Sequence, residues 1–501
     1  MNCNLWGIYV NEANNVTIIG NNISVWDRNT SYAIYLCDSI GSTISNNNLK
    51  AQGDELTFTL LSYEIYDCLF ENNNITAIGT GILHPYIETI CFDGVHSISE
   101  LSKTYGVIFD FSSNNKFIHN DINVTSLVKG FQVPYNPSVN ILIGLYLYYD
   151  SDYNNISNNN VWVEGHDPFL YGIGCSGDDT SKSVTTADYN IFKDNNVTVK
   201  GDYFSTGLIL RHNSINTLVD NNYINLNAIN YTYGITLELS GFSNVVNNKI
   251  NNSAHGNYGI ELYSSWSNNI GGNTIYSDAS FTESVGAYGS SGNNFTNNVM
   301  ISLGDSLFNP AQGPEHPDAV NLKNVAMWFD SRSSGNRIEG NLIYTDAPYG
   351  IEFAGGSTGN YVGNNNIYAG SSYGDGAILD NVGGNTVSNN KGQIFNGTIN
   401  AGGSMVANGS SNYQNDAILS DDSDVNGASD NGAVDYGLVA NALSSAGIGS
   451  GDVASSSSNA YTLSSASLAA MSGSSQYVVP LIILFIIALF CYSFLTERKD
   501  E

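Results

Sequence analysis

The chain has 501 residues, of which 46 are acidic and only 16 are lysine or arginine, so its formal net charge is -30. A surface with this charge repels phosphate backbones, which excludes nucleic-acid binding. Apolar residues make up 42% of the sequence, enough for a substantial core. The six cysteines form no C-x-x-C pair, so we expect neither a structural metal nor a cofactor.

The N-terminus lacks the features of an export signal. Residues 1–10 contain no basic segment and no apolar run, and residues 7–10 (GIYV) are typical of a β-strand. We therefore expect either that the true start lies upstream or that this chain is the C-terminal part of a longer protein.

Residues 1–400 repeat one pattern: an apolar strand that begins with glycine, a polar corner, and an asparagine-rich step into another apolar residue. The asparagine step is predicted to end at Ile23, Leu49, Ile75, Ile122, Val161, Val197, Ile224, Ile250, Ile275, Val299, Ile343 and Ile367. A period of about 25 residues indicates a solenoid, in which each repeat buries its apolar side by stacking on its neighbours.

The repeat consists of strands, because apolar and polar residues alternate over short runs bounded by glycine or asparagine. Ile235 and Ile260 begin two such runs and should point inward, as should Ile351. Asparagine suits the corners, since it tolerates a left-handed backbone and its amide can bond to the asparagines of adjacent coils. About fourteen coils at roughly 4.8 Å each would form a rod about 65 Å long.

The N-N-x-I corners and the Y-G-I-x-L strands, as at residues 258–262 and 349–353, resemble the repeats of pectate-lyase-like proteins. With the C-terminal tail described below, the chain resembles adhesin-like surface proteins of methanogenic archaea. The resemblance implies an all-β fold, a right-handed parallel β-helix solenoid. It is less specific for function, because this fold carries lyases, hydrolases and non-catalytic binders.

Motifs expected of a catalytic β-helix are few. A polygalacturonase-like enzyme would need N-T-D, D-D, G-H-G and R-I-K segments, and only the pair Asp178 and Asp179 occurs, which a solvated loop also explains. Arg211 and Glu238 should stack in neighbouring coils with His212 beside them. These three are weak catalytic candidates, and a surface ion pair is the alternative. Two loops, 165–168 and 309–318, concentrate proline and ionisable groups, as a rigid connection or a site would.

The sequence offers a clearer candidate for a binding surface than for a catalytic site. Outward strand positions carry tyrosines that should project from one sheet face: Tyr9, Tyr35, Tyr66, Tyr146, Tyr148 and Tyr263. Their rings combine flat apolar faces with a polar tip, which suits stacking on sugars, although tyrosine also simply favours strands. Cys37 and Cys68 each follow a strand isoleucine by three residues and should stack, as a disulfide or as two thiols.

Composition changes after residue 400. Residues 401–476 are mostly Ser, Gly, Ala, Asn and Asp, which predicts a flexible, disordered acidic stalk. Residues 477–495 carry no charge and are long enough to form one transmembrane helix, a buried core helix being the alternative. Arg498 and Lys499 then place the tail, 496–501, in the cytoplasm and the β-helix outside the cell.

These features predict a single-pass cell-membrane protein, an adhesin-like molecule that binds extracellular glycans or the surfaces of other cells through its β-helix. A cell-surface polysaccharide lyase or glycoside hydrolase is the alternative.

Overall fold

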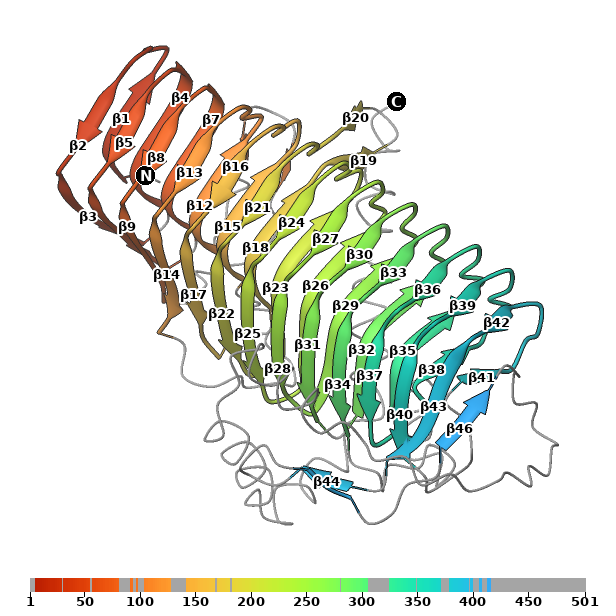
Figure 1. Ribbon diagram of the computed structural model, residues 1–501. Helices are drawn as coiled ribbons and strands as arrows, with labels where there is room; N and C mark the ends of the chain where they lie inside the picture. The colour runs from red at the N-terminus through yellow and green to blue at the C-terminus, as the bar shows by residue number, and fades with distance from the viewer. Residues whose placement is uncertain are drawn as a thin grey trace.

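The computed structural model describes residues 5–80, 91–92, 96–97, 103–127, 141–166, 169–180, 183–304, 324–370, 378–399, 405–407 and 412–415, except residues 29, 55, 280, 348 and 396. Its strands form three long sheets whose neighbouring strands are parallel and come from successive repeats. The coils stack in sequence order from the red to the blue end of the chain (Figure 1). This is the predicted parallel β-helix.

Sheet A has 13 strands. They are β1 (Leu5–Asn11), β4 (Thr30–Ile40), β7 (Leu56–Tyr66), β12 (Lys103–Asp110), β15 (Ile141–Tyr148), β18 (Phe169–Ser176), β23 (Phe204–Arg211), β26 (Tyr231–Glu238), β29 (Gly256–Tyr263), β32 (Phe281–Tyr288), β35 (Val325–Asp330), β38 (Ile351–Phe353) and β41 (Ile378–Asp380).

Sheet B also has 13 strands, all short. They are β2 (Thr17–Ile19), β5 (Thr43–Ser45), β8 (Leu69–Glu71), β13 (Lys116–Ile118), β16 (Asn155–Ser157), β21 (Ile191–Lys193), β24 (Leu218–Asp220), β27 (Asn244–Val246), β30 (Asn269–Gly271), β33 (Asn294–Thr296), β36 (Arg337–Glu339), β39 (Tyr361–Gly363) and β42 (Thr386–Ser388).

Sheet C has 14 strands. They are β3 (Asn22–Asp27), β6 (Asn48–Gly53), β9 (Asn74–Gly79), β14 (Asp121–Ser126), β17 (Asn160–Glu164), β22 (Asn196–Gly201), β25 (Tyr223–Ala228), β28 (Lys249–Ser253), β31 (Thr274–Asp278), β34 (Val299–Leu303), β37 (Leu342–Thr345), β40 (Asn366–Gly370), β43 (Asn390–Phe395) and β46 (Asn412–Asn415). The last, β46, pairs antiparallel to β43.

Three short antiparallel pairs lie outside the coils: β10 (Cys91–Phe92) with β11 (His96–Ser97), β19 (Asp178–Thr180) with β20 (Ser183–Thr185), and β44 (Gly397–Ile399) with β45 (Met405–Ala407). Strands β45 and β46 fall within the range predicted as stalk. The rest of 401–476, and all of 477–501, lie outside the described residues. Among the described residues, no helix is long and apolar enough to cross a membrane.

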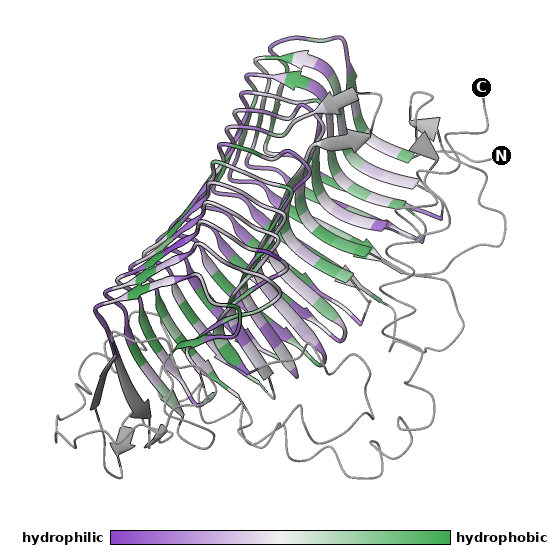
Figure 2. Cartoon of the chain, turned by 90° about the vertical axis from the view of Figure 1, so that its right-hand side faces the viewer, coloured by the Kyte–Doolittle hydropathy of each residue, from purple (hydrophilic) through white to green (hydrophobic). Residues whose placement is uncertain are grey.

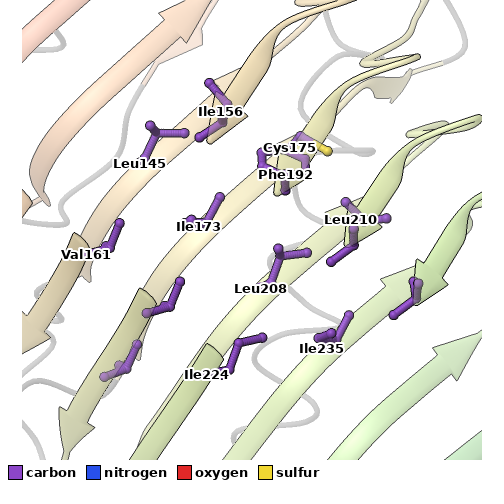
Figure 3. Close-up of a cluster of buried hydrophobic side chains, with 14 of the residues drawn as sticks. Leu145, Ile156, Val161, Ile173, Cys175, Phe192, Leu208, Leu210, Ile224 and Ile235 are labelled. Carbon is purple, nitrogen blue, oxygen red and sulfur yellow. The ribbon is translucent and has the colours of Figure 1, made fainter. Parts of the chain in front are cut away.

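The core consists of side chains stacked in columns. Leu145, Ile173, Leu208 and Ile235 occupy equivalent positions on β15, β18, β23 and β26 and follow one another along the stack (Figure 3). Ile235, Ile260 and Ile351 are all fully buried, as predicted. The predicted end of one asparagine step is wrong by one residue, because Met300, not Val299, pairs with Ile275 and enters the core.

Asparagine ladders line the corners. At the corner between sheets B and C, one buried asparagine per coil donates its side-chain amide to the next, through Asn47, Asn73, Asn120, Asn159, Asn195, Asn222, Asn248, Asn273, Asn298, Asn341, Asn365 and Asn390. A second buried ladder borders sheet B on its other side, and Asn268 and Asn293 belong to it. The polar corners appear as purple edges along the coils in Figure 2. The predicted stacking of asparagine is confirmed.

The predicted stacking of Cys37 on Cys68 is wrong. Cys37 pairs with Tyr63, because Ile34 is equivalent to Leu60 and not to Ile65. Cys68 lies instead at the corner, where its backbone N–H donates to Asn115 Oδ1. Both cysteines are free and buried.

Candidate functional site

The outward face of sheet A carries aromatic side chains in columns. Tyr32, Phe58 and Tyr105 follow one another on β4, β7 and β12, with ring centroids 5.2 and 5.1 Å apart and rings within 6° of parallel. Further along the same column, Tyr233 and Tyr258 stack at 4.7 Å. This spacing matches that of the strands, so the sheet itself aligns the rings.

The tyrosines singled out from the sequence divide among three columns. Tyr9, Tyr35 and Tyr146 share one column, and Tyr148 and Tyr263 share the next. Tyr66 does not belong with them, because it pairs with Ile40 at the end of β7, beyond the face.

Only part of this face is accessible. Trp6 and Tyr9 on β1 are 44% and 48% exposed, and their rings stack at 5.1 Å. Tyr9 in turn lies 5.3 Å from the ring of half-buried Tyr35. Tyr146 is buried in a second apolar cluster, on the outward face, with Phe58 and Tyr105. Among the described residues, the most exposed rings of this face therefore lie on β1, whereas Tyr233, Tyr258 and Tyr288 further along it are half-buried.

Two neighbouring glutamates on this face were not among the sequence candidates. Glu261 and Glu283 lie on adjacent strands and are 0% and 2% exposed. Oxygens of both carboxyl groups lie within 2.6 Å of the point that a Cβ at Gly286 would occupy, so only glycine leaves them room. The hydroxyl of Tyr288 lies 2.8 and 2.9 Å from the two oxygens of Glu283.

The environments of the two carboxyl groups differ. Burial raises the pKa of Glu261 well above its usual value, and the charge of Glu283 adds to the shift, which the nearby Tyr263 hydroxyl opposes only in part. Neither oxygen of Glu261 accepts a well-formed hydrogen bond. The neutral form of Glu261 is therefore favoured, beside Glu283, whose carboxylate accepts a hydrogen bond from the Tyr288 hydroxyl. Such a pair could exchange protons with a substrate.

Arg211, His212 and Glu238 meet as predicted. Arg211 Nε donates to Glu238 Oε2 at 2.8 Å, and His212 Nε2 lies 3.8 Å from Oε1. Burial would raise the pKa of Glu238, but the nearby His212 and the charge of Arg211 lower it to about 2. Because the guanidinium and the carboxylate neutralise each other, we interpret the group as an ion pair between coils rather than an acid-base pair.

The remaining candidates form no site with these residues. Asp178 and Asp179 lie on β19, which forms a hairpin with β20. His166 Nδ1 lies 2.9 Å from Asp202 Oδ2, and residues 309–318 lie outside the described part of the chain. No group of three or more metal-ligating side chains occurs among the described residues.

Comparisons with known proteins add little. No protein-family model matches the chain, and no curated protein matches it. A solved structure with some similarity is that of a mutant of the periplasmic alginate epimerase AlgG, at 12% sequence identity and a TM-score of 0.26, over 72% of this chain and 78% of that one. The described chain is thus a parallel β-helix protein on the evidence of its own strands and ladders.

Proposed function

We propose that the chain is a membrane-anchored, adhesin-like cell-surface protein that binds glycans through the outward face of sheet A. The accessible stack of Trp6, Tyr9 and Tyr35 supports the proposal, because aromatic rings held at strand spacing on a rigid sheet are pre-organised to stack on sugar rings. The net charge of -30 favours extracellular glycans over nucleic acids as partners.

The anchor is proposed from the sequence. The uncharged segment 477–495, followed by Arg498 and Lys499, would cross the membrane once with the β-helix outside. Protease added to intact cells should then remove the β-helix and spare an epitope tag placed after residue 501. A chain lacking 477–501 should be released in soluble form. Digestion of the tag along with the β-helix would rule out this orientation.

A cell-surface polysaccharide lyase or hydrolase is the second candidate, and the pair Glu261 and Glu283 favours it. The burial of that pair argues against it, because a glycosidic bond must reach both carboxyl groups for acid-base catalysis. The geometry therefore favours binding over turnover.

One experiment separates the two functions. The full chain would be screened on a glycan array and, in parallel, assayed for new reducing ends and unsaturated products. Binding without turnover, weakened by the double substitution Tyr9→Ala and Tyr35→Ala, is the expected result. Turnover that is lost in Glu283→Gln would overturn the assignment as a binder.

A further inference from the structure

A second aromatic surface lies at the corner where the chain leaves sheet A for sheet B. One residue per coil at this corner has a left-handed backbone, and in most coils its N–H donates to a carbonyl of the next coil. Most members of this column are Gly, Asn, Asp or Ser: Asn15, Gly41, Asp67, Asn114, Asn216, Ser267, Gly292, Gly335, Gly359 and Gly384. The exceptions are Tyr153, Tyr189 and Phe242, which we call the corner aromatic strip.

The backbone does not favour these three residues. Their φ angles are +55°, +55° and +56°, a region in which a bulky side chain is strained. Their side chains are also 56%, 46% and 53% exposed, so the free energy gained by burying them offsets little of that strain. Strain of this kind persists where the surroundings hold the backbone in place, and it concentrates at functional sites.

The surroundings do hold this corner. Asp152, just before Tyr153, accepts the backbone N–H of Asp188 at 2.6 Å. Asp188, just before Tyr189, accepts that of Ile215 at 2.9 Å. These carboxylates fix the corner in three successive coils, so the rings project from a rigid base.

The strip has the geometry of a binding surface. The rings of Tyr153 and Tyr189 lie 4.8 Å apart and within 2° of parallel. Half-buried Asn216 occupies the next coil, and Phe242 follows it, roughly 10 Å from Tyr189 at two coil spacings. Beside Phe242, the indole of Trp266 covers Gly241, where a Cβ would come within 2.5 Å of the indole nitrogen. The rings of Tyr189 and Phe242 thus flank the side-chain amide of Asn216 along the corner.

We propose that the corner aromatic strip is a separate binding site for an uncharged glycan chain. Sugar rings would stack on Tyr189 and Phe242, and the Asn216 amide would bond to a hydroxyl between them. The ligand class follows from charge, because Asp150, Asp152 and Asp188 border the strip and would repel a polyuronate. Nearby Arg211 is already paired with Glu238. The inference rests on the proposed function only for the class of ligand, a glycan.

The test uses the full chain and a variant in which Tyr153, Tyr189 and Phe242 are all replaced by asparagine. Asparagine tolerates the left-handed backbone, so this variant should keep its circular dichroism and its melting temperature. Affinity would be measured on xylan, glucomannan and chitin oligosaccharides, with polygalacturonate as the anionic comparison. We expect the triple variant to bind its neutral glycan at least about tenfold more weakly. The control Trp26→Ala, which removes a 55% exposed ring on sheet C, should bind unchanged.

The outcomes separate this inference from the proposed function. If the triple variant binds as tightly as the unaltered chain while the Tyr9 and Tyr35 variant loses binding, the strip is not a site and the proposed function stands. If the unaltered chain binds no glycan, both fail. Binding of polygalacturonate through the strip would overturn the assignment to uncharged glycans. Should the triple variant fail to fold, Phe242→Asn alone provides the same comparison.

Discussion

Replacing Asn248 with alanine should destabilise the β-helix far more than replacing its exposed neighbour Asn244. The Asn248 side chain takes part in four hydrogen bonds. Its Nδ2 donates to the Val219 carbonyl at 2.9 Å and to Asn273 Oδ1 at 3.0 Å. Its Oδ1 accepts the backbone N–H and the side-chain amide of Asn222, both at 2.9 Å. All four bonds lie inside the corner, away from water.

The expected loss of stability follows from the polar groups that Asn248→Ala leaves without a partner. The buried N–H of Asn222 loses its acceptor, which alone costs about 1–3 kcal/mol, and the three other bonds contribute about 1 kcal/mol each at most. We expect a loss of roughly 1–6 kcal/mol in the free energy of unfolding. Asn244 is exposed, and its Oδ1 accepts a single bond of 3.3 Å, so Asn244→Ala should cost less than about 0.5 kcal/mol.

Urea unfolding followed by circular dichroism would measure both variants. Because each coil contacts only its neighbours, the damage should also be local, and hydrogen exchange should show lost protection at Asn222 and its flanking strands. Equal midpoints for Asn248→Ala and Asn244→Ala would refute the reasoning, and would mean that the ladder aligns coils without stabilising them.

Three further predictions concern buried groups. Ile260→Asp places an unpaired charge in the core and should cost roughly several kcal/mol, whereas Asn227→Asp on the exposed side of sheet C should leave the urea midpoint nearly unchanged. Glu261→Gln should raise the melting temperature near pH 7 but not near pH 3.5. Because the pKa of Glu261 is raised in the folded chain, this residue costs stability only above pH 4.5, its usual pKa, where its carboxyl group ionises more readily in the unfolded chain than in the folded chain. An equal gain at both pH values would contradict this reasoning. Cys175 should resist alkylation in the folded chain near pH 8, because burial raises the pKa of its thiol to about 12, and ready modification would contradict its burial.

The fold was predictable because its determinants are local and periodic. An asparagine two residues before an inward apolar residue sets the corner between sheets B and C, and eleven of the twelve coils in the ladder repeat that arrangement. Where two asparagines precede two apolar residues, as at 297–300, the sequence does not say which asparagine joins the ladder. Only the register of Ile275 with Met300 decides it.

The positions of individual side chains on the outward face were less predictable. Counting from the strand glycine fails at β7, where Thr59 occupies the glycine position and the strand extends into the corner. Tyr66 and Cys68 were misplaced for this reason.

The sequence does contain a pattern that places Glu261 and Glu283 next to each other. Glu261 follows its strand glycine by two residues, and Glu283 precedes Ser284, which occupies the glycine position of the next coil. Both positions point outward on adjacent strands. The catalytic motifs of β-helix enzymes do not point to these two glutamates, because they lie in different repeats and match none of those motifs.

A solenoid separates the residues that stabilise it from those that face outward. The ladders and core columns of each coil are satisfied by the coils on either side, so an outward residue can change without disturbing them. The corner aromatic strip is an extreme case. The carboxylates of Asp152 and Asp188 already hold the backbone of their corners, so that backbone keeps a left-handed conformation even where a tyrosine occupies it. Bulky residues such as Phe111 and Leu239 also hold a left-handed backbone at the preceding corner, but they are half-buried. It is therefore the exposure and alignment of the three rings, rather than the strain alone, that points to a ligand.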